Sequence, residues 1–197
     1  STEPAHFTLT EDGAYLPTPF AQSHWGDDHL NGPAVVGLAA RALENHCGSE
    51  DFMPARFTAD LFRAARGAPT TVDARVVRDG RRVRSAECDV VQDGRIVARA
   101  TLVQYRTSSA PPGRQWAAPM SFVQPPPPDG AIMPYVGSDE GLDPIAGEHQ
   151  NDSRKRFYND AIEVVAGEKN SPFVRAVIIA EATSLVTNLG TEGIGYI

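Results

Sequence analysis

The sequence predicts an α+β fold in which an antiparallel sheet wraps around one central helix. Two features lead to this prediction: one long apolar helix over 33–46, and a series of strands between 54 and 106 in which polar and apolar residues alternate. A helix that is apolar on most sides has to be covered. An antiparallel sheet with one apolar face also needs cover on that face. Each of the two elements therefore supplies the surface that the other requires.

The predicted helix begins abruptly after a polar loop. Asn31 is a suitable N-cap, because its side-chain oxygen can accept a hydrogen bond from a first-turn N–H, and Pro33 fits the first turn. The free N–H groups and the partial positive charge at this end can hold a carbonyl or an oxyanion. Asn31 and Gly32 are therefore candidates for binding the substrate. Gly48 is expected to end the helix in the left-handed conformation.

The strands are predicted from alternation and from turn signals. The Asp-Gly pairs at 79–80 and 93–94 are strong hairpin signals, and their similar surroundings predict the same hairpin twice. Another Asp-Gly pair, at 12–13, joins two short strands near the N-terminus. The expected strands cover 6–10, 14–16, 56–62, 70–78, 82–91 and 95–105. The later ones form an antiparallel meander with one polar and one apolar face.

Composition narrows the class of protein. A formal charge of −7 argues against nucleic-acid binding. The sequence shows no apolar run of the roughly 20 residues that a membrane helix needs, and no signal peptide. Cys47 and Cys88 are isolated and fit a reducing compartment, so a cytoplasmic location is expected. The high arginine content is typical of a GC-rich genome, and we expect a bacterial source.

The order of strand, helix and long meander resembles the hotdog fold. The loop His24-Trp25-Gly26-Asp27-Asp28-His29-Leu30-Asn31-Gly32, which leads into a helix of small residues, is similar to the entry of the hotdog helix in acyl-CoA thioesterases. The whole chain resembles the thioesterase II group, in which one polypeptide carries two hotdog units.

The resemblance implies three parts. Residues 1–106 form an N-terminal hotdog domain, 107–135 a proline-rich linker, and 136–197 the first half of a second hotdog domain. In the last part we expect a mobile loop over 137–152, a strand over 157–165, a helix over 173–189 capped near Ser171, and a strand from 193. The remaining strands of the second unit are expected beyond Ile197. Hotdog units commonly pair, so a homo-oligomer is also expected.

The candidate catalytic residues are Asp28, His29 and Glu181. Asp28 and His29 lie close to the positive end of the first helix, together with Asp27. Glu181 lies among apolar residues of the second helix, where an unpaired carboxylate is costly to bury. It therefore has a partner, faces solvent, or has a raised pKa and a function. The candidate substrate-binding residues are His24, Asn31, Gly32, Thr183 and Ser184. The spacing of His24 and His29 matches no standard zinc pattern, so no metal is expected.

The resemblance implies hydrolysis of an acyl-CoA thioester by activated water, within fatty acid metabolism and with CoA as part of the substrate and no other cofactor. In the thioesterase II group the water is activated by an aspartate on the strand after the second helix, with Gln and Ser/Thr partners. Residues 193–197 contain no aspartate, so this group is expected beyond Ile197.

Two alternatives keep the fold. One is a non-catalytic acyl-CoA-binding protein. The other is a hotdog enoyl-CoA hydratase or dehydratase. Those enzymes use an Asp/His pair on a loop before the helix, and this pair is loosely similar to Asp27, Asp28 and His29. Arginine outnumbers acidic residues between 54 and 106; this basic segment fits either the phosphates of CoA or an ordinary solvated face.

Overall fold

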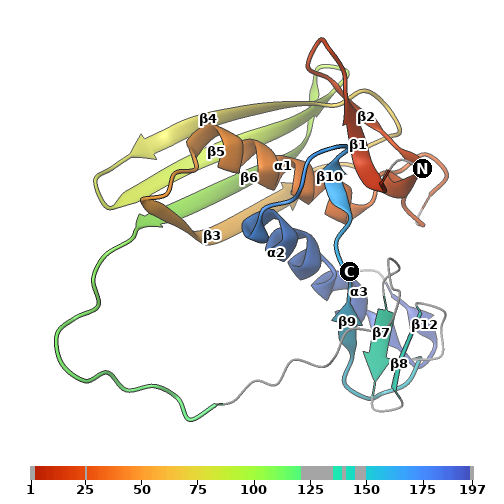
Figure 1. Ribbon diagram of the computed structural model, residues 1–197. Coiled ribbons are helices and arrows are strands. Elements are labelled where there is room, and N and C mark those ends of the chain that lie inside the picture. The colour runs from red at the N-terminus through yellow and green to blue at the C-terminus, as the bar shows by residue number, and fades with distance from the viewer. Residues whose placement is uncertain (1–2, 25, 121–134, 139–140, 145–149, 196–197) are drawn as a thin grey trace.

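Helix α1 (Gly32–Cys47) lies against one face of a four-stranded antiparallel sheet (Figure 1). The computed structural model describes residues 3–24, 26–120, 135–138, 141–144 and 150–195, with the backbone alone at 141–144. The sheet consists of β3 (Phe52–Leu61), β4 (Thr71–Asp79), β5 (Val83–Gln92) and β6 (Arg95–Arg106). The predicted α+β class, with an antiparallel sheet packed on a central helix, is confirmed.

The order of strands in this sheet is β3-β6-β5-β4. Only the last three strands form a meander, because β3 pairs with β6 rather than with β4. β3 also begins earlier than predicted and includes Pro54. A shift of register between Pro54 and Arg56 accommodates this residue, since proline has no N–H to donate and is tolerated at edges and bulges.

The two Asp-Gly turns have different structures. Asp93 and Gly94 have φ angles of 49° and 69°, as a tight turn between right-twisted strands requires. Gly80 has no positive φ; its N–H donates to Val83 O across a longer loop. The prediction that the same hairpin is used twice is therefore wrong, because β4 and β5 shift register near Val76 and enter their turn differently.

The core forms where α1 meets the sheet. Leu38 and Leu43 of α1 are fully buried, and the facing positions of β5 and β6 are buried too. Many of these facing residues are small, which lets the helix approach the strands closely. The members on the sheet are Ala86, Cys88, Val90, Ala98, Ala100 and Leu102.

Both ends of α1 are fixed by hydrogen bonds. Asn31 is the N-cap, with its side chain accepting from Ala34 N, as predicted. At the other end Arg84 Nη1 donates to Cys47 O over 2.8 Å, which suits the negative end of the helix. Gly48 is extended (φ −65°, ψ 146°), not left-handed as predicted. Glycine is needed there for space, because a Cβ would lie 2.4 Å from Glu44 O.

A second, three-stranded sheet adds Phe7, Tyr15 and Val164 to the core around α1. β1 (Ala5–Leu9) pairs antiparallel with β2 (Tyr15–Pro17), which leads into the 3-10 turn η1 (Pro19–Ala21). The predicted N-terminal hairpin is confirmed. β1 also pairs in parallel with β10 (Glu163–Val165), so the distant second half of the chain completes this sheet.

The predicted strand over 157–165 is divided between two sheets. β9 (Arg156–Tyr158) joins β7 (Tyr135–Ser138) and β8 (Gly141–Pro144), whereas β10 lies beside β1. Ala161, between β9 and β10, has a positive φ of 36°. The expected mobile loop over 137–152 is wrong where it overlaps β7 and β8, because backbone pairing orders both strands. The rest of that range, at 139–140 and 145–149, lies outside the described residues.

The predicted helix over 173–189 is two helices. α2 (Pro172–Glu181), capped by Ser171, ends at Ala182, and α3 (Thr183–Thr187) follows. Ser184 Oγ donates to Glu181 O, and this kind of competition for helix carbonyls bends or breaks helices. The chain then forms the short hairpin of β11 (Leu189–Gly190) and β12 (Gly193–Ile194).

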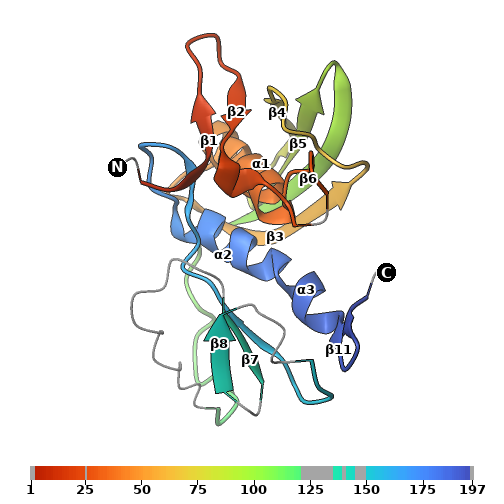
Figure 2. The same cartoon turned by 90° about the vertical axis from the view of Figure 1, so that its right-hand side faces the viewer.

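Helices α1 and α2 run antiparallel and side by side (Figure 2). Gly32 lies against Glu181, and Gly37 lies against Ile178. Residues 107–120 form no helix or strand and extend away from the sheet (Figure 1). The rest of the expected linker, up to 134, lies outside the described residues, and the three-part division of the chain stays a prediction.

Ion pairs order the polar face of the sheet. Asp89 is 7% exposed and lies between two arginines of neighbouring strands. Its carboxylate accepts from Arg99 Nε (2.6 Å) and Nη2 (3.0 Å) and from Arg75 Nη1 (3.1 Å). The hydrogen bond from Arg99 and then the bond and charge of Arg75 lower the pKa of Asp89. This part of the basic strand segment is therefore neutralised within the sheet.

We expect Gly37→Leu to destabilise the fold. A Cβ at Gly37 would lie 3.0 Å from Val164 Cγ2 and 3.1 Å from Ile178 Cγ1, and overpacking of this kind costs about 1–3 kcal/mol. Gly190→Leu is the control, because the nearest atom to its Cβ would be 3.9 Å away. Urea unfolding measures both. Equal midpoints for the two variants would contradict close packing of α1 on α2.

We expect Asp89→Asn to lower the free energy of unfolding by about 1 kcal/mol at neutral pH, since both arginine partners are partly exposed to solvent. The pKa of Asp89 is lowered in the folded protein, so its contribution is present above the unfolded pKa and is lost as pH falls through the folded pKa. Asp79→Asn, in a pair whose carboxylate is 66% exposed, should cost less. Thermal unfolding between pH 2 and 7 checks both variants.

Candidate functional site

The N-terminus of α1 meets the last residue of α2. A Cβ built on Gly32 would lie 1.9 Å from Glu181 Oε1 and 2.5 Å from its Cδ. The carboxylate therefore occupies the space that any other residue at position 32 would fill. Gly32 and Glu181 are about 150 positions apart in the sequence. They were predicted separately, one as a substrate-binding and one as a catalytic residue, and the structure brings them together.

Gly32 presents a backbone donor at this point. The Asn31 side chain accepts from Ala34 N (2.8 Å), Asn31 O accepts from Val35 N, and Pro33 has no N–H. Among the described residues, Gly32 N–H is then the first-turn donor for which no partner is recorded. A donor at a helix N-terminus, where the dipole adds positive potential, suits an oxyanion or a carbonyl oxygen.

Burial raises the pKa of Glu181 above its ordinary value. Within the part of the chain that the structure describes, no cation or hydrogen-bond donor is recorded at its carboxylate. Because the charged form is desolvated without compensation, the carboxylate binds a proton more readily than one in water does. A carboxylate of this kind, in reach of a water molecule, can act as a general base.

Asp28 and His29 serve the loop rather than the contact between Gly32 and Glu181. Asp28 Oδ1 accepts from Gly67 N over 2.9 Å, which ties the loop before α1 to the connection between β3 and β4. The His29 ring lies against Gly26, where a Cβ would be 2.5 Å from Nδ1. His24 is exposed. None of the three has a recorded contact with Glu181.

Asn31, Thr183 and Ser184 bond mainly to backbone. Asn31 Nδ2 donates to Phe20 O (3.0 Å) while its oxygen caps α1, so this side chain fixes the position of Gly32. Ser184 Oγ bonds Glu181 O, and Thr183 O accepts from Thr187 Oγ1. Both α3 residues are exposed. Among the described substrate-binding candidates, Gly32 lies against the Glu181 carboxylate, whereas Ser184 bonds the backbone carbonyl of Glu181.

Gln92 is a further residue of this region, and no sequence pattern indicated it. This residue is 5% exposed; its Oε1 accepts from Arg66 N (2.9 Å), and its Nε2 donates to Arg66 O (2.9 Å) and Thr70 Oγ1 (2.9 Å). It holds the loop that Asp28 also contacts. A glutamine beside an Asp-Gly turn carries no signal of this role, because its partners lie more than 20 positions away.

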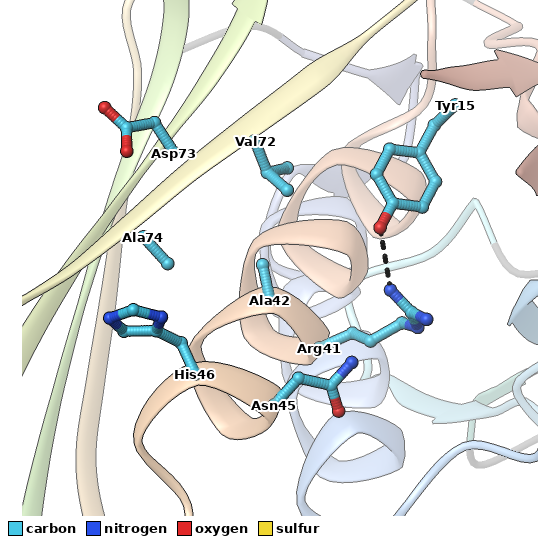
Figure 3. A pocket seen from close by; sticks show the side chains of 8 residues that line it. All are labelled: Tyr15, Arg41, Ala42, Asn45, His46, Val72, Asp73 and Ala74. Atoms are coloured by element: carbon cyan, nitrogen blue, oxygen red, sulfur yellow. Dashed lines mark hydrogen bonds between the residues drawn. The ribbon is translucent and has the colours of Figure 1, made fainter. Parts of the chain in front are cut away.

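A separate open groove of about 430 Å³ lies at the other end of α1 (Figure 3). Ala42, Val72 and Ala74 form its apolar part, and Arg41 donates to the Tyr15 hydroxyl over 3.0 Å at its edge. Asn45, His46 and Asp73 complete the lining. None of the predicted site residues belongs to this groove.

The described residues contain no group of three or more His, Cys, Asp or Glu side chains placed to hold a metal ion. No helix among them combines the length and the apolar character that crossing a bilayer demands.

Residues 21–105 match the family model described as the acyl-CoA thioesterase N-terminal domain. This segment contains α1, the strands β3 to β5 and nearly all of β6. Comparison with curated proteins finds no match. The family match therefore concerns less than half of the chain, and it supports the thioesterase family for that segment.

Several solved structures are similar to this chain. The chain resembles the tesB protein of Mycobacterium avium subsp. paratuberculosis with a TM-score of 0.54 and 12% identity, over 93% of this chain and 69% of that one. A candidate thioesterase II from Thermobifida fusca is 20% identical over 60% of this chain, with a TM-score of 0.44, and the match spans 43% of its own length. A Thermus thermophilus thioesterase complexed with coenzyme A and Zn is 20% identical, over 48% of this chain and 77% of that one, with a TM-score of 0.40. Of these three, the tesB structure has a TM-score above 0.5, and it supports a shared hotdog-type α+β fold.

We expect Gly32→Ala to push the Glu181 carboxylate away from α1. The clash is with the end of a flexible side chain, so the free energy of unfolding should change by less than about 1 kcal/mol. Displaced toward solvent, Glu181 should lose part of its desolvation, and its pKa should fall toward the ordinary value. An NMR titration of the Glu181 carboxyl carbon in both proteins measures this, and an unchanged pKa would contradict the contact.

Proposed function

We propose that the protein hydrolyses acyl-CoA thioesters, with Glu181 as general base and Gly32 N–H as oxyanion donor. The observation that carries the proposal is the contact between the Glu181 carboxylate and the first residue of α1. The carboxylate, whose pKa is raised by burial, lies against the residue whose N–H is the proposed donor, and thioester hydrolysis needs both a base and a donor. The match of 21–105 to the acyl-CoA thioesterase N-terminal domain supports the substrate class.

The proposed reaction proceeds without a covalent intermediate. The Glu181 carboxylate takes a proton from a water molecule as the water oxygen attacks the thioester carbon. The negative charge that develops on the carbonyl oxygen accepts a hydrogen bond from Gly32 N–H. The carbon–sulfur bond then breaks, and the CoA thiolate receives the proton from Glu181. The products are a free acid and CoA, and the carboxylate is regenerated.

The finer expectations belong to the same proposal. They are a thioesterase II-like layout with two hotdog units, pairing of units in a homo-oligomer, a cytoplasmic location in a bacterium, a role in fatty acid metabolism, and no cofactor besides the CoA of the substrate. The hydratase alternative would use Asp28 and His29, which lie against Gly67 and Gly26. The geometry therefore favours hydrolysis.

We expect Glu181→Gln to lower the rate of thiol release from acyl-CoA by about 10²–10⁴-fold, as loss of a general base does. In the parent protein the acid limb of kcat/KM should lie above the ordinary range of a glutamate, because burial raises the pKa of Glu181. Asp28→Asn is the matched control, since an amide oxygen can still accept from Gly67 N–H. Its activity should stay close to that of the parent.

Stability separates this role from a structural one. A carboxyl whose pKa is raised by folding stabilises the fold below its unfolded pKa and loses that contribution as pH rises through its folded pKa. At neutral pH Glu181→Gln should therefore leave the free energy of unfolding unchanged or raised. Full activity in Glu181→Gln would overturn the assignment. Thiol release that appears only in a chain extended beyond Ile197 would favour, as the general base, the aspartate that the thioesterase II resemblance implies. If both this chain and the extended chain bind CoA but release no thiol from acyl-CoA, the non-catalytic alternative would be favoured.

A further inference from the structure

We propose that the loop from Phe62 to Gly67 binds the nucleotide end of CoA, with Arg63 and Arg66 on its phosphates and Phe62 against its adenine. The proposal rests on the proposed function for its substrate class. Of the many arginines between 54 and 106, the proposal concerns Arg63 and Arg66, together with the aromatic residue Phe62.

The charges of Arg63 and Arg66 are available. Both residues are exposed, and among the described residues neither guanidinium has a recorded ion pair or hydrogen bond. By contrast, Arg75, Arg84 and Arg99 of the sheet are paired with carboxylates. An unpaired guanidinium presents several donors in a planar fork that matches a phosphate group.

The backbone that carries these arginines is held firmly. The buried Gln92 side chain bonds both Arg66 N and Arg66 O, each over 2.9 Å. Arg63 N donates to Val97 O at the start of the loop. A loop fixed in this way loses little conformational entropy when a ligand binds, which favours affinity.

The loop is also attached to the candidate catalytic site. Leu30 N donates to Ala65 O over 2.8 Å, and Gly67 N donates to Asp28 Oδ1 over 2.9 Å. Leu30 lies two positions before Gly32 in the chain. The loop therefore lies beside the segment that leads into the proposed oxyanion donor, where the CoA part of a bound thioester would leave the site.

Phe62 adds a feature that phosphate alone does not need. Phe62 is 52% exposed and lies directly after β3 and directly before Arg63. Stacking of a base on an aromatic side chain contributes about 1–3 kcal/mol. An exposed aromatic ring next to two free arginines fits a phosphorylated adenine nucleotide better than it fits an inorganic anion.

The test uses isothermal titration calorimetry of the full chain with free CoA and with pantetheine, which lacks the nucleotide. We expect the double variant Arg63→Ala/Arg66→Ala to bind CoA at least about tenfold more weakly and to bind pantetheine as the parent does. Phe62→Ala should weaken CoA binding and leave binding of inorganic pyrophosphate unchanged. Raising the salt concentration should weaken CoA binding by the parent more than by the double variant.

The matched control is Arg81→Ala/Arg82→Ala. These arginines are also exposed, but they follow β4, at the end opposite to the Phe62–Gly67 loop. Their replacement should leave CoA affinity unchanged. Equal loss in the two double variants would show a general effect of net charge and overturn the proposal, as would CoA binding by Arg63→Ala/Arg66→Ala at parental affinity.

Glu181→Gln separates this inference from the proposed function. Because free CoA has no thioester, its binding does not depend on a general base, and this variant should keep the parental CoA affinity. If thiol release is absent and CoA binding still depends on Arg63 and Arg66, the hydrolase proposal fails and this inference stands. If thiol release depends on Glu181 and CoA affinity is independent of both arginines, the reverse holds.

Discussion

The close packing of α1 on α2 is the contact on which the candidate site depends. Gly37 has no side chain, so Val164 and Ile178 can fill the space against α1. With the two helices antiparallel at this distance, the end of α2 reaches the start of α1. Glu181 then meets Gly32, a second position without a Cβ. Two glycines on one helix therefore determine both the packing and the position of the carboxylate.

Polar side chains around the start of α1 are used almost entirely to hold backbone. Asn31 caps the helix and bonds Phe20 O, Asp28 bonds Gly67 N–H, and Gln92 clamps Arg66. These bonds connect three loops that would otherwise be independent. The consequence is a rigid surround in which the Glu181 carboxylate stands out, because no partner for it is recorded among the described residues. Glu181 is partly buried, and departures from the usual pairing of polar groups concentrate at functional sites.

The two faces of the four-stranded sheet differ in polarity, because one packs on α1 and the other does not. The face toward α1 carries small apolar residues and accepts the helix. The opposite face carries Asp89 between Arg75 and Arg99, so its charges are balanced within the sheet. In the middle of these strands, arginines of the basic segment between 54 and 106 are therefore paired with a carboxylate of the same sheet. The loop arginines Arg63 and Arg66 have no partner recorded among the described residues, and both are exposed to a soluble anion.

The sequence by itself determined the local elements of this protein. Asn31 and Pro33 set the start of α1, Ser171 and Pro172 set the start of α2, and Asp93-Gly94 set a tight hairpin, because caps and turns depend on residues within four positions of one another. Only the tertiary structure decided that β3 lies beside β6, that 157–165 divides between two sheets, and that Glu181 meets Gly32. These outcomes depend on backbone pairing and on the space between side chains that are distant in the chain, and neither leaves a periodic signal. Asp28 and Gln92 show the same limit, since their roles are set by single hydrogen bonds to loops far away in the sequence.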